Sequence, residues 1–267
     1  MSPTHPTKLS EKQIEQFHRE GYVMLGRLTP PEAIEALCNR IDQIMLGNLV
    51  YPGMLMQLDP ADGATGTDQT RSFKGSTLKY RKIQDLDLDP LFLEFMRHPM
   101  FRDLTRRIIG ENISVFRCMF FNKPAGSKVP LGWHQDGSDG WGMNIAPKIT
   151  VWVALDATNR ANGCLKIVPG SHRSVIAGGK GLSPEQVMQY APESKVMDLE
   201  MEKGETVLLH NWALHSSGEN HTNGPRRAFS VCYIDAASQQ TATGKSFTRI
   251  FPEYARTSND ADTAITF

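Results

Sequence analysis

The 267-residue sequence lacks an excess of charge of either sign, because 29 lysines and arginines balance 29 aspartates and glutamates. A dedicated nucleic-acid-binding protein needs a basic excess to neutralise phosphates, and a polybasic membrane-surface protein needs one to bind anionic lipids. The sequence also lacks any apolar run near the roughly 18 residues of a membrane-spanning helix. We therefore expect neither nucleic acid nor a membrane as a partner. A neutral chain leaves the oligomeric state open.

Cysteine is scarce and unpaired in sequence. The four cysteines form no CxxC pair and no zinc-ribbon spacing: Cys38, Cys118, Cys164 and Cys232. Widely spaced cysteines in apolar surroundings are typical of a reducing compartment. The first eight residues are polar and do not resemble a secretory signal, and the last three, Ile265 to Phe267, are not a peroxisomal signal of the SKL type. These observations predict a cytoplasmic protein.

Helical patterns occupy the first part of the chain. Ser10 to Arg19 has a capping-box start and one apolar face, and a short strand is expected at Tyr22 to Leu25. A second helix follows, with Thr29 as its expected N-cap. Helical spacing returns from Asp89 to Gly110, where Pro99 is expected to divide it into two helices.

Strand patterns dominate the second part. The expected strands are Ile113 to Asn122, Ile149 to Leu155, Cys164 to Val168, Thr206 to His210 and Ala228 to Ile234. Helices first and strands second predict an α+β chain with an antiparallel sandwich or barrel. We expect one domain over 1–267, with a mainly helical part at about 10–110 and a strand-rich core at about 111–236. The Gly- and Asp-rich stretch within 51–77 is long enough to suggest a functional loop or lid.

The densest chemical signal is the pair His134 and Asp136. Side chains at i and i+2 of a strand share a face, so these two could bind one metal ion. With a second histidine they would form a two-His-one-carboxylate site, which leaves open positions on Fe(II) for a co-substrate and O₂. The pair alone is weak, because such spacing is common by chance and a surface histidine is the simpler interpretation.

Several downstream residues could complete the site. His215 follows a short apolar strand, and Arg226 starts the next strand eleven residues later, so a hairpin would bring Arg226 beside His215. A fixed guanidinium suits bidentate capture of the far end of a dicarboxylate. Arg226 could equally be a solvated charge at a strand end. His210 could be a histidine at the core edge, and His221 is expected to be an exposed loop residue.

The order His134-x-Asp136, His215, Arg226 resembles the Fe(II)/2-oxoglutarate oxygenases of the phytanoyl-CoA dioxygenase type. Further matching segments, in order and at similar spacing, are Gly21-Tyr22, Lys82 to Asp85, Asn122 to Pro124, Trp152 to Leu155, Asn162 to Leu165 and Pro169 to His172. The resemblance extends from about residue 10 to residue 236. It implies a double-stranded β-helix, the jelly roll of cupin-like proteins, with flanking helices that are mostly N-terminal.

The resemblance also implies the roles of individual residues. It implies His134, Asp136 and His215 as iron ligands, and Arg226 with Ser217 on the distal carboxylate of 2-oxoglutarate. Three further residues match positions that line the co-substrate pocket: Lys82, Met119 and Trp152. From composition alone, Lys82 would be interpreted as a solvated charge, and Met119 and Trp152 as core. His172 is expected to fix its turn by a hydrogen bond, and Gln135 is left without a role.

The function implied is that of a dioxygenase of the EC 1.14.11 type, which hydroxylates an unactivated C–H bond of a small metabolite or natural-product intermediate and releases succinate and CO₂. Its cofactors would be Fe(II), 2-oxoglutarate and O₂, and ascorbate is a candidate reductant. Related halogenases lack the ligand carboxylate, whereas Asp136 is present here. Two alternatives stay open: a cupin-like metal-dependent hydrolase or isomerase, and a non-catalytic jelly-roll binding module. The sequence does not identify the substrate or the site of oxidation, and it does not separate hydroxylation from desaturation.

Overall fold

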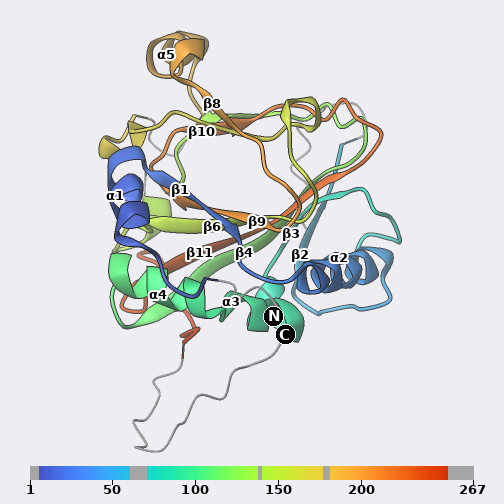
Figure 1. The fold of residues 1–267 in the computed structure, drawn as a ribbon. Coiled ribbons are helices and arrows are strands. Elements are labelled where there is room, and N and C mark those ends of the chain that lie inside the picture. Colours follow the sequence, from blue (N-terminus) through green and yellow to red (C-terminus); the bar gives the residue numbers. More distant parts are fainter. Residues whose placement is uncertain (1–5, 61–70, 72, 138–139, 177–180, 252–267) are drawn as a thin grey trace, which may run out of the picture.

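Two antiparallel sheets face each other in the structure, a computed structural model that describes residues 6–60, 71, 73–137, 140–176 and 181–251 (Figure 1). The larger sheet has seven strands in the order β1-β9-β6-β11-β4-β3-β2, and the smaller has four in the order β5-β10-β7-β8. Neighbouring strands are antiparallel throughout. This is the jelly roll that the resemblance implied.

The strands of the larger sheet are β1 (Tyr22–Arg27), β2 (Leu55–Leu58), β3 (Tyr80–Gln84), β4 (Ile113–Lys123), β6 (Ile149–Ala154), β9 (Glu205–His210) and β11 (Arg226–Asp235). Those of the smaller sheet are β5 (Leu131–His134), β7 (Leu165–Ile167), β8 (Met197–Leu199) and β10 (His215–Ser217). The five strands expected in the second part of the chain are present. Three strands of the larger sheet, β1 to β3, come from the mainly helical first part of the chain.

The α-helices are α1 (Glu11–Glu20), α2 (Pro31–Leu46), α3 (Pro90–Met96), α4 (Pro99–Ile108) and α5 (Pro184–Tyr190). Short 3-10 helices cover Leu86–Leu88, Gly140–Gly142, Arg160–Asn162, Ser171–Arg173 and Glu193–Lys195. In Figure 1, α2, α3 and α4 lie on the side of the larger sheet that faces away from the smaller one. The flanking helices are therefore mostly N-terminal, as expected.

The first residues of the helices can be compared with the predicted capping residues. Ser10 caps α1 with a full capping box, and Pro99 begins α4 after the break that follows α3, as predicted. The prediction for α2 was wrong by one residue: Pro30 is its N-cap, in an extended conformation and without a side-chain cap. Thr29 is buried instead. A proline at each of these positions is tolerated because the first-turn N–H groups have no partner within the helix.

The larger sheet has two chemically different faces, because successive side chains of a strand point to opposite sides. Along β11, Phe229, Val231 and Tyr233 belong to the apolar core beneath the helices. The Phe229 ring lies 4.9 Å from the ring of Phe92 on α3. The alternate positions, from Arg226 to Cys232, point to the inner side, towards the smaller sheet, where a cavity lies between the sheets.

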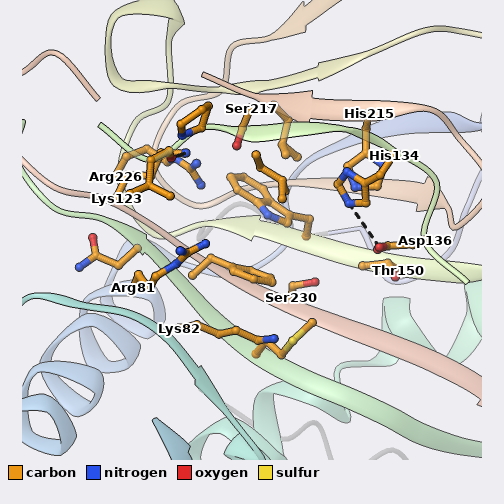
Figure 2. A pocket seen from close by; sticks show the side chains of 18 of the residues that line it. Arg81, Lys82, Lys123, His134, Asp136, Thr150, His215, Ser217, Arg226 and Ser230 are labelled. Carbon is orange, nitrogen blue, oxygen red and sulfur yellow. Dashed lines mark hydrogen bonds and ion pairs between the residues drawn. The ribbon is translucent and has the colours of Figure 1, made fainter. Parts of the chain in front are cut away.

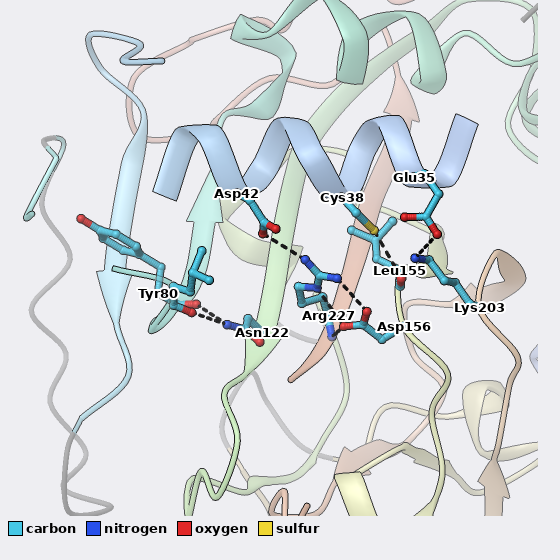
Figure 3. A network of polar contacts seen from close by, with 10 residues as sticks. Glu35, Cys38, Asp42, Tyr80, Asn122, Leu155, Asp156, Lys203 and Arg227 are labelled. Atoms are coloured by element: carbon cyan, nitrogen blue, oxygen red, sulfur yellow. Dashed lines mark hydrogen bonds and ion pairs between the residues drawn. The ribbon is translucent and has the colours of Figure 1, made fainter. Parts of the chain in front are cut away.

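A polar network ties α2 to the start of β11 (Figure 3). The Arg227 guanidinium donates to both carboxylate oxygens of Asp156, at 2.8 and 2.9 Å, and to Asp42 of α2 at 3.0 Å. The hydrogen bonds and the nearby carboxylates raise the pKa of Arg227 despite its partial burial, which lowers it. The backbone next to Arg226 is thereby fixed from the outer side of the sheet.

No helix in the described part of the chain is both long and apolar enough to cross a membrane. The loop suggested within 51–77 contains β2 and reaches into 61–70 and 72, which lie outside the described residues.

Candidate metal centre and co-substrate pocket

His134, Asp136 and His215 come together at the inner edge of the smaller sheet (Figure 2). His134 ends β5 and pairs directly with His215, the first residue of β10, so that their ring centroids are 4.2 Å apart. His134 Nε2 lies 3.5 Å from Asp136 Oδ1. One ligand atom from each residue lies within 4.8 Å of the others, and no other such group of three exists among the residues that the structure describes.

The strand argument for this pair was partly wrong. β5 ends at His134, and Asp136 lies in the turn after it rather than on the same strand face. The turn continues through Gly137, whose φ of 63° is in the left-handed region that favours glycine. The carboxylate therefore reaches the imidazole through a turn.

Each histidine ring is oriented by its own backbone. Nδ1 of His134 lies 2.8 Å from the carbonyl oxygen of Gly132, and Nδ1 of His215 lies 2.9 Å from that of Ala213. A carbonyl only accepts hydrogen bonds, so the proton is on Nδ1 in both rings. Nε2 is then the nitrogen that each ring presents to a metal ion, in the arrangement usual for metal-binding histidines.

The charges of these groups suit a cation. Burial, reinforced by the neighbouring His134, lowers the pKa of His215 to about 4 and keeps that ring neutral. Burial alone would raise the pKa of Asp136, but the hydrogen bond to His134 and the nearby positive charges lower it overall. For His134, burial lowers the pKa, and the hydrogen bond and charge of Asp136 more than reverse this.

The three residues line a cavity of about 220 Å³ between the sheets. Its other walls include Met119, Thr150, Trp152, Leu165, Leu209, Ser217, Ser230 and Cys232. The charged groups around it are unevenly divided. Among the lining residues described, five are cationic, namely Arg81, Lys82, Arg117, Lys123 and Arg226, and two are carboxylates, Asp59 and Asp136. The chain as a whole has no net charge, but basic side chains outnumber carboxylates at this cavity.

Arg226 is a buried guanidinium that faces the cavity. Only 3% of the residue is exposed, and within the described chain its Nε has no hydrogen-bond partner. Its Cζ lies 5.8 Å from the ring centroid of Trp152. Burial lowers its pKa to about 10. A buried cation without a counter-ion is costly, and its position therefore indicates an anionic ligand.

The predicted hairpin between His215 and Arg226 was wrong. β10 pairs with β5 and β7 in the smaller sheet, whereas β11 pairs with β4 and β6 in the larger one. The two residues nevertheless line the same cavity from opposite walls, with Ser217 on the His215 side (Figure 2). His215 and Arg226 therefore share a cavity because the two sheets face each other, and not because one turn joins their strands.

Three residues whose roles came only from the resemblance also line the cavity: Lys82, Met119 and Trp152. The interpretation of Lys82 as a solvated charge was wrong, because Lys82 is half-buried on β3. Burial, with the charges of Arg117 and Arg81, lowers its pKa. Trp152 is only 4% exposed, and Met119 only 9%, but both face the cavity as well as the core.

The remaining histidines have other surroundings. His172 Nε2 lies 3.2 Å from the carbonyl of His18, so its hydrogen bond ties the turn to α1 rather than closing the turn itself. The His210 ring lies near that of His172, with centroids 5.0 Å apart and the rings tilted, and burial with the charges of neighbouring cations lowers the pKa of His210 to about 4. His221 is exposed, as expected. Gln135 is buried, and its amide donates to the carbonyls of Ser174 and Trp212.

The sequence reasoning missed three basic residues of the cavity: Arg81, Arg117 and Lys123. A signal for two of them was present. Arg117, Met119, Phe121 and Lys123 alternate along β4, and Met119 was already assigned to the pocket, so its strand neighbours at i±2 and i+4 face the same side. Arg81 had no such signal, because the strand that carries it was not predicted.

Comparison with known proteins gives consistent results. The family model described as Phytanoyl-CoA dioxygenase (PhyH) matches residues 17–228. A probable phytanoyl-CoA dioxygenase of Caenorhabditis elegans is 27% identical over 241 residues, which cover 85% of this chain and 76% of that protein. The peroxisomal phytanoyl-CoA dioxygenase of Rattus norvegicus is 27% identical over 84% of this chain and 68% of its own length.

Several solved structures have a fold similar to that of this chain. EctD from S. alaskensis, crystallised with 2-oxoglutarate and 5-hydroxyectoine, superposes with a TM-score of 0.71 at 19% identity and covers 90% of this chain and 80% of its own. The α-ketoglutarate-dependent carbocyclase SnoK of nogalamycin biosynthesis gives a TM-score of 0.68 at 18% identity, with 90% and 89% covered. At these identities the similarity concerns the fold alone.

Proposed function

The chain belongs to the phytanoyl-CoA dioxygenase family, and from this premise we propose that His134, Asp136 and His215 form the iron site of a 2-oxoglutarate-dependent dioxygenase. Its proposed reaction is hydroxylation of an unactivated C–H bond in a small molecule. The observation that carries the proposal is a buried guanidinium, Arg226, in the same cavity as a two-His-one-carboxylate cluster. A metal-dependent hydrolase would need the cluster but not Arg226, and a binding module would need neither.

The residues fit the metal ion and the co-substrate. Two imidazoles that present Nε2, with an ionised carboxylate, are the donor set of non-haem Fe(II) oxygenases, and the set leaves positions open for other ligands. Bound Fe(II), with 2-oxoglutarate and O₂, supplies the oxidising power and leaves succinate and CO₂. The intact carboxylate of Asp136 agrees with an oxidation that needs no halide.

The protein's own part is binding, orientation and exclusion of water. Arg226 would bind the distal carboxylate of 2-oxoglutarate in a bidentate manner, and Ser217 could donate a hydrogen bond to the same group. Trp152 would hold the co-substrate chain on its apolar side, together with Met119. Lys82, which lines the same cavity, would add a positive charge. Such pre-organised contacts fix the reacting groups and cost little reorganisation.

Four further predictions go with this function. We treat residues 1–267 as one domain, since helices α2 to α4 cover the outer face of the larger sheet. A cytoplasmic location stays a prediction, and the rat relative is named as a peroxisomal enzyme. The predicted lack of nucleic-acid and membrane partners likewise stays a prediction. Ascorbate is proposed as a reductant that maintains Fe(II).

An anaerobic titration of the metal-free protein with Fe(II) and 2-oxoglutarate tests the proposal. We expect the weak visible charge-transfer absorption that a keto acid gives when it chelates ferrous iron, and its loss in His215→Ala. His221→Ala is the matched control, because His221 is exposed and outside the cavity. Iron binding without this absorption would contradict the proposal and favour the hydrolase.

A further inference from the structure

The strand pairing of the smaller sheet stops at the metal site. His134 is the last residue of β5 and His215 the first of β10, and the two pair directly. Asp136 lies beyond this pair in a turn, and the residues that lead into His215, 211–214, lie beyond it on the other chain segment. The ladder therefore fixes the two histidines relative to each other, but it does not fix the carboxylate relative to them.

Two side chains join these segments where the pairing has stopped. Gln135, between the first two ligands, donates from Nε2 to the carbonyl of Trp212 at 2.6 Å. Trp212 donates from its indole Nε1 to the carbonyl of Gly137 at 3.3 Å. We call these two hydrogen bonds the cross-tie. Gly137 and Trp212 are each three residues beyond the paired His134 and His215, so the cross-tie lies where a continued ladder would have joined the segments.

The amide of Gln135 is buried and fits its surroundings in one orientation only. The residue is 2% exposed, and its Oε1 accepts the backbone N–H of Ile176 at 2.6 Å. Its Nε2 faces the carbonyl oxygens of Ser174, at 2.9 Å, and of Trp212. A backbone N–H only donates and a carbonyl only accepts, so exchanging the amide oxygen and nitrogen would place an acceptor against two acceptors. Both ends of the amide are thus fixed to main chain.

The cross-tie acts from outside the cavity. The described residues that line the cavity include all three metal ligands, but neither Gln135 nor Trp212. Neither side chain carries a charge, so neither changes the electrostatic attraction of the site for a cation. Any effect of the cross-tie on a bound metal ion must therefore pass through the position of the ligands.

We propose that Gln135 is a positioning residue of the metal centre, and that its hydrogen bond to Trp212 sets the position of Asp136 relative to His215 before the metal binds. This inference rests on the proposed function, which makes His134, Asp136 and His215 the ligands. Ligands that are already in place lose little conformational freedom on binding, so the affinity for the metal is higher. Removal of contacts that orient ligands typically weakens metal binding about 10- to 100-fold.

Titration of the metal-free protein with Mn(II), without 2-oxoglutarate, tests the inference. Free Mn(II) is measured by EPR at a temperature at which far-UV circular dichroism shows each variant to be folded. Gln135→Met keeps the length of the side chain but removes its donor and acceptor, and we expect it to weaken binding at least about tenfold. It should also change the EPR spectrum of bound Mn(II), which reports the ligand geometry. Trp212→Phe removes only the longer hydrogen bond and should weaken binding about two- to fivefold.

Asn162→Leu is the matched control. Asn162 is also a buried amide with both ends bonded to main chain: its Oδ1 accepts from the N–H of Asn159 at 2.8 Å, and its Nδ2 donates to the carbonyl of Ala157 at 2.9 Å. It does not line the cavity. We expect this variant to lose stability but to keep the Mn(II) affinity and the EPR spectrum of the wild-type protein.

Three outcomes would overturn the inference: wild-type affinity in Gln135→Met, an equal loss of affinity in Asn162→Leu, or an unchanged spectrum of bound Mn(II) in Gln135→Met. If Gln135→Met does not fold, Trp212→Phe decides, and an unchanged affinity in that variant overturns the inference. The proposed function fails separately, when His215→Ala binds Mn(II) as tightly as the wild-type protein does.

Discussion

The two faces of the seven-stranded sheet are built by the same strands and have opposite chemistry. On β11, Phe229 and Tyr233 pack against the helices, while Arg226 and Ser230, at alternate positions, face the cavity. The outer face is mainly apolar core, with the Arg227 network at one end, and the inner face combines charges, hydroxyls and a tryptophan. Adjacent residues of one strand therefore contribute either to stability or to function. Substitutions one residue apart should accordingly affect either the free energy of unfolding or ligand binding.

The largest expected effect is on the outer face. Phe229→Ala should lower the free energy of unfolding by about 3–5 kcal/mol, because it leaves a cavity among aromatic rings of α3 and β11. Ser230→Ala, the next residue on the inner face, should change it by less than about 1 kcal/mol. Urea unfolding of the metal-free proteins measures both. Similar losses in the two variants would remove the proposed division between the faces.

The reverse pattern is expected for Arg226. Arg226→Met should raise the KM for 2-oxoglutarate by roughly 30-fold, since a charge-assisted hydrogen bond contributes about 2 kcal/mol. The free energy of unfolding should be unchanged or higher, because a buried charge whose Nε has no partner in the described chain is removed. Succinate release and urea unfolding test the two parts. An unchanged KM would show that Arg226 does not bind the co-substrate.

Arg227 sharpens the comparison, because it is adjacent to Arg226 but on the outer side. Arg227→Gln removes hydrogen bonds to Asp156 and Asp42 and should lower the free energy of unfolding by about 1–3 kcal/mol. The KM for 2-oxoglutarate should rise only a few-fold, through loosening of the strand. Asp42→Asn, which removes the charge of a single partner, is the milder control. A KM effect as large as that of Arg226→Met would contradict the assignment of the two arginines to different faces.

The smallest expected effect is a pH dependence through Lys123. Its pKa is lowered to about 7 by burial, Arg226 and Arg81, and is partly restored by Asp59 and Glu219. An anion bound beside it stabilises the charged form, so binding of 2-oxoglutarate takes up a proton above pH 7 and weakens by roughly three- to tenfold between pH 6.5 and 8.5. Calorimetry of the Mn(II)-loaded protein in two buffers measures the proton uptake. Lys123→Gln should reduce it, and an undiminished uptake would exclude Lys123 as its source.

Long periodic segments and capped helices were predictable from local sequence, as α1 with Ser10 and the break at Pro99 illustrate. The short strands β2, β3 and β10 were not, because segments of three to five residues with charged positions have no period of their own and are strands only through their neighbours. The residues of the site also divide into those that the sequence predicts and those that it does not. The ligands were recognisable by order and spacing, and Arg117 by its alternation with Met119 along a predicted strand, whereas Arg81 needed the sheet to bring it to the cavity.

The two histidine rings owe their orientation to the main chain, through the carbonyls of Gly132 and Ala213. A main-chain acceptor is present whatever side chain its residue carries, so no single substitution elsewhere deletes either hydrogen bond. The orientation of the two imidazole rings is therefore fixed by the course of the backbone and depends little on the side chains around them.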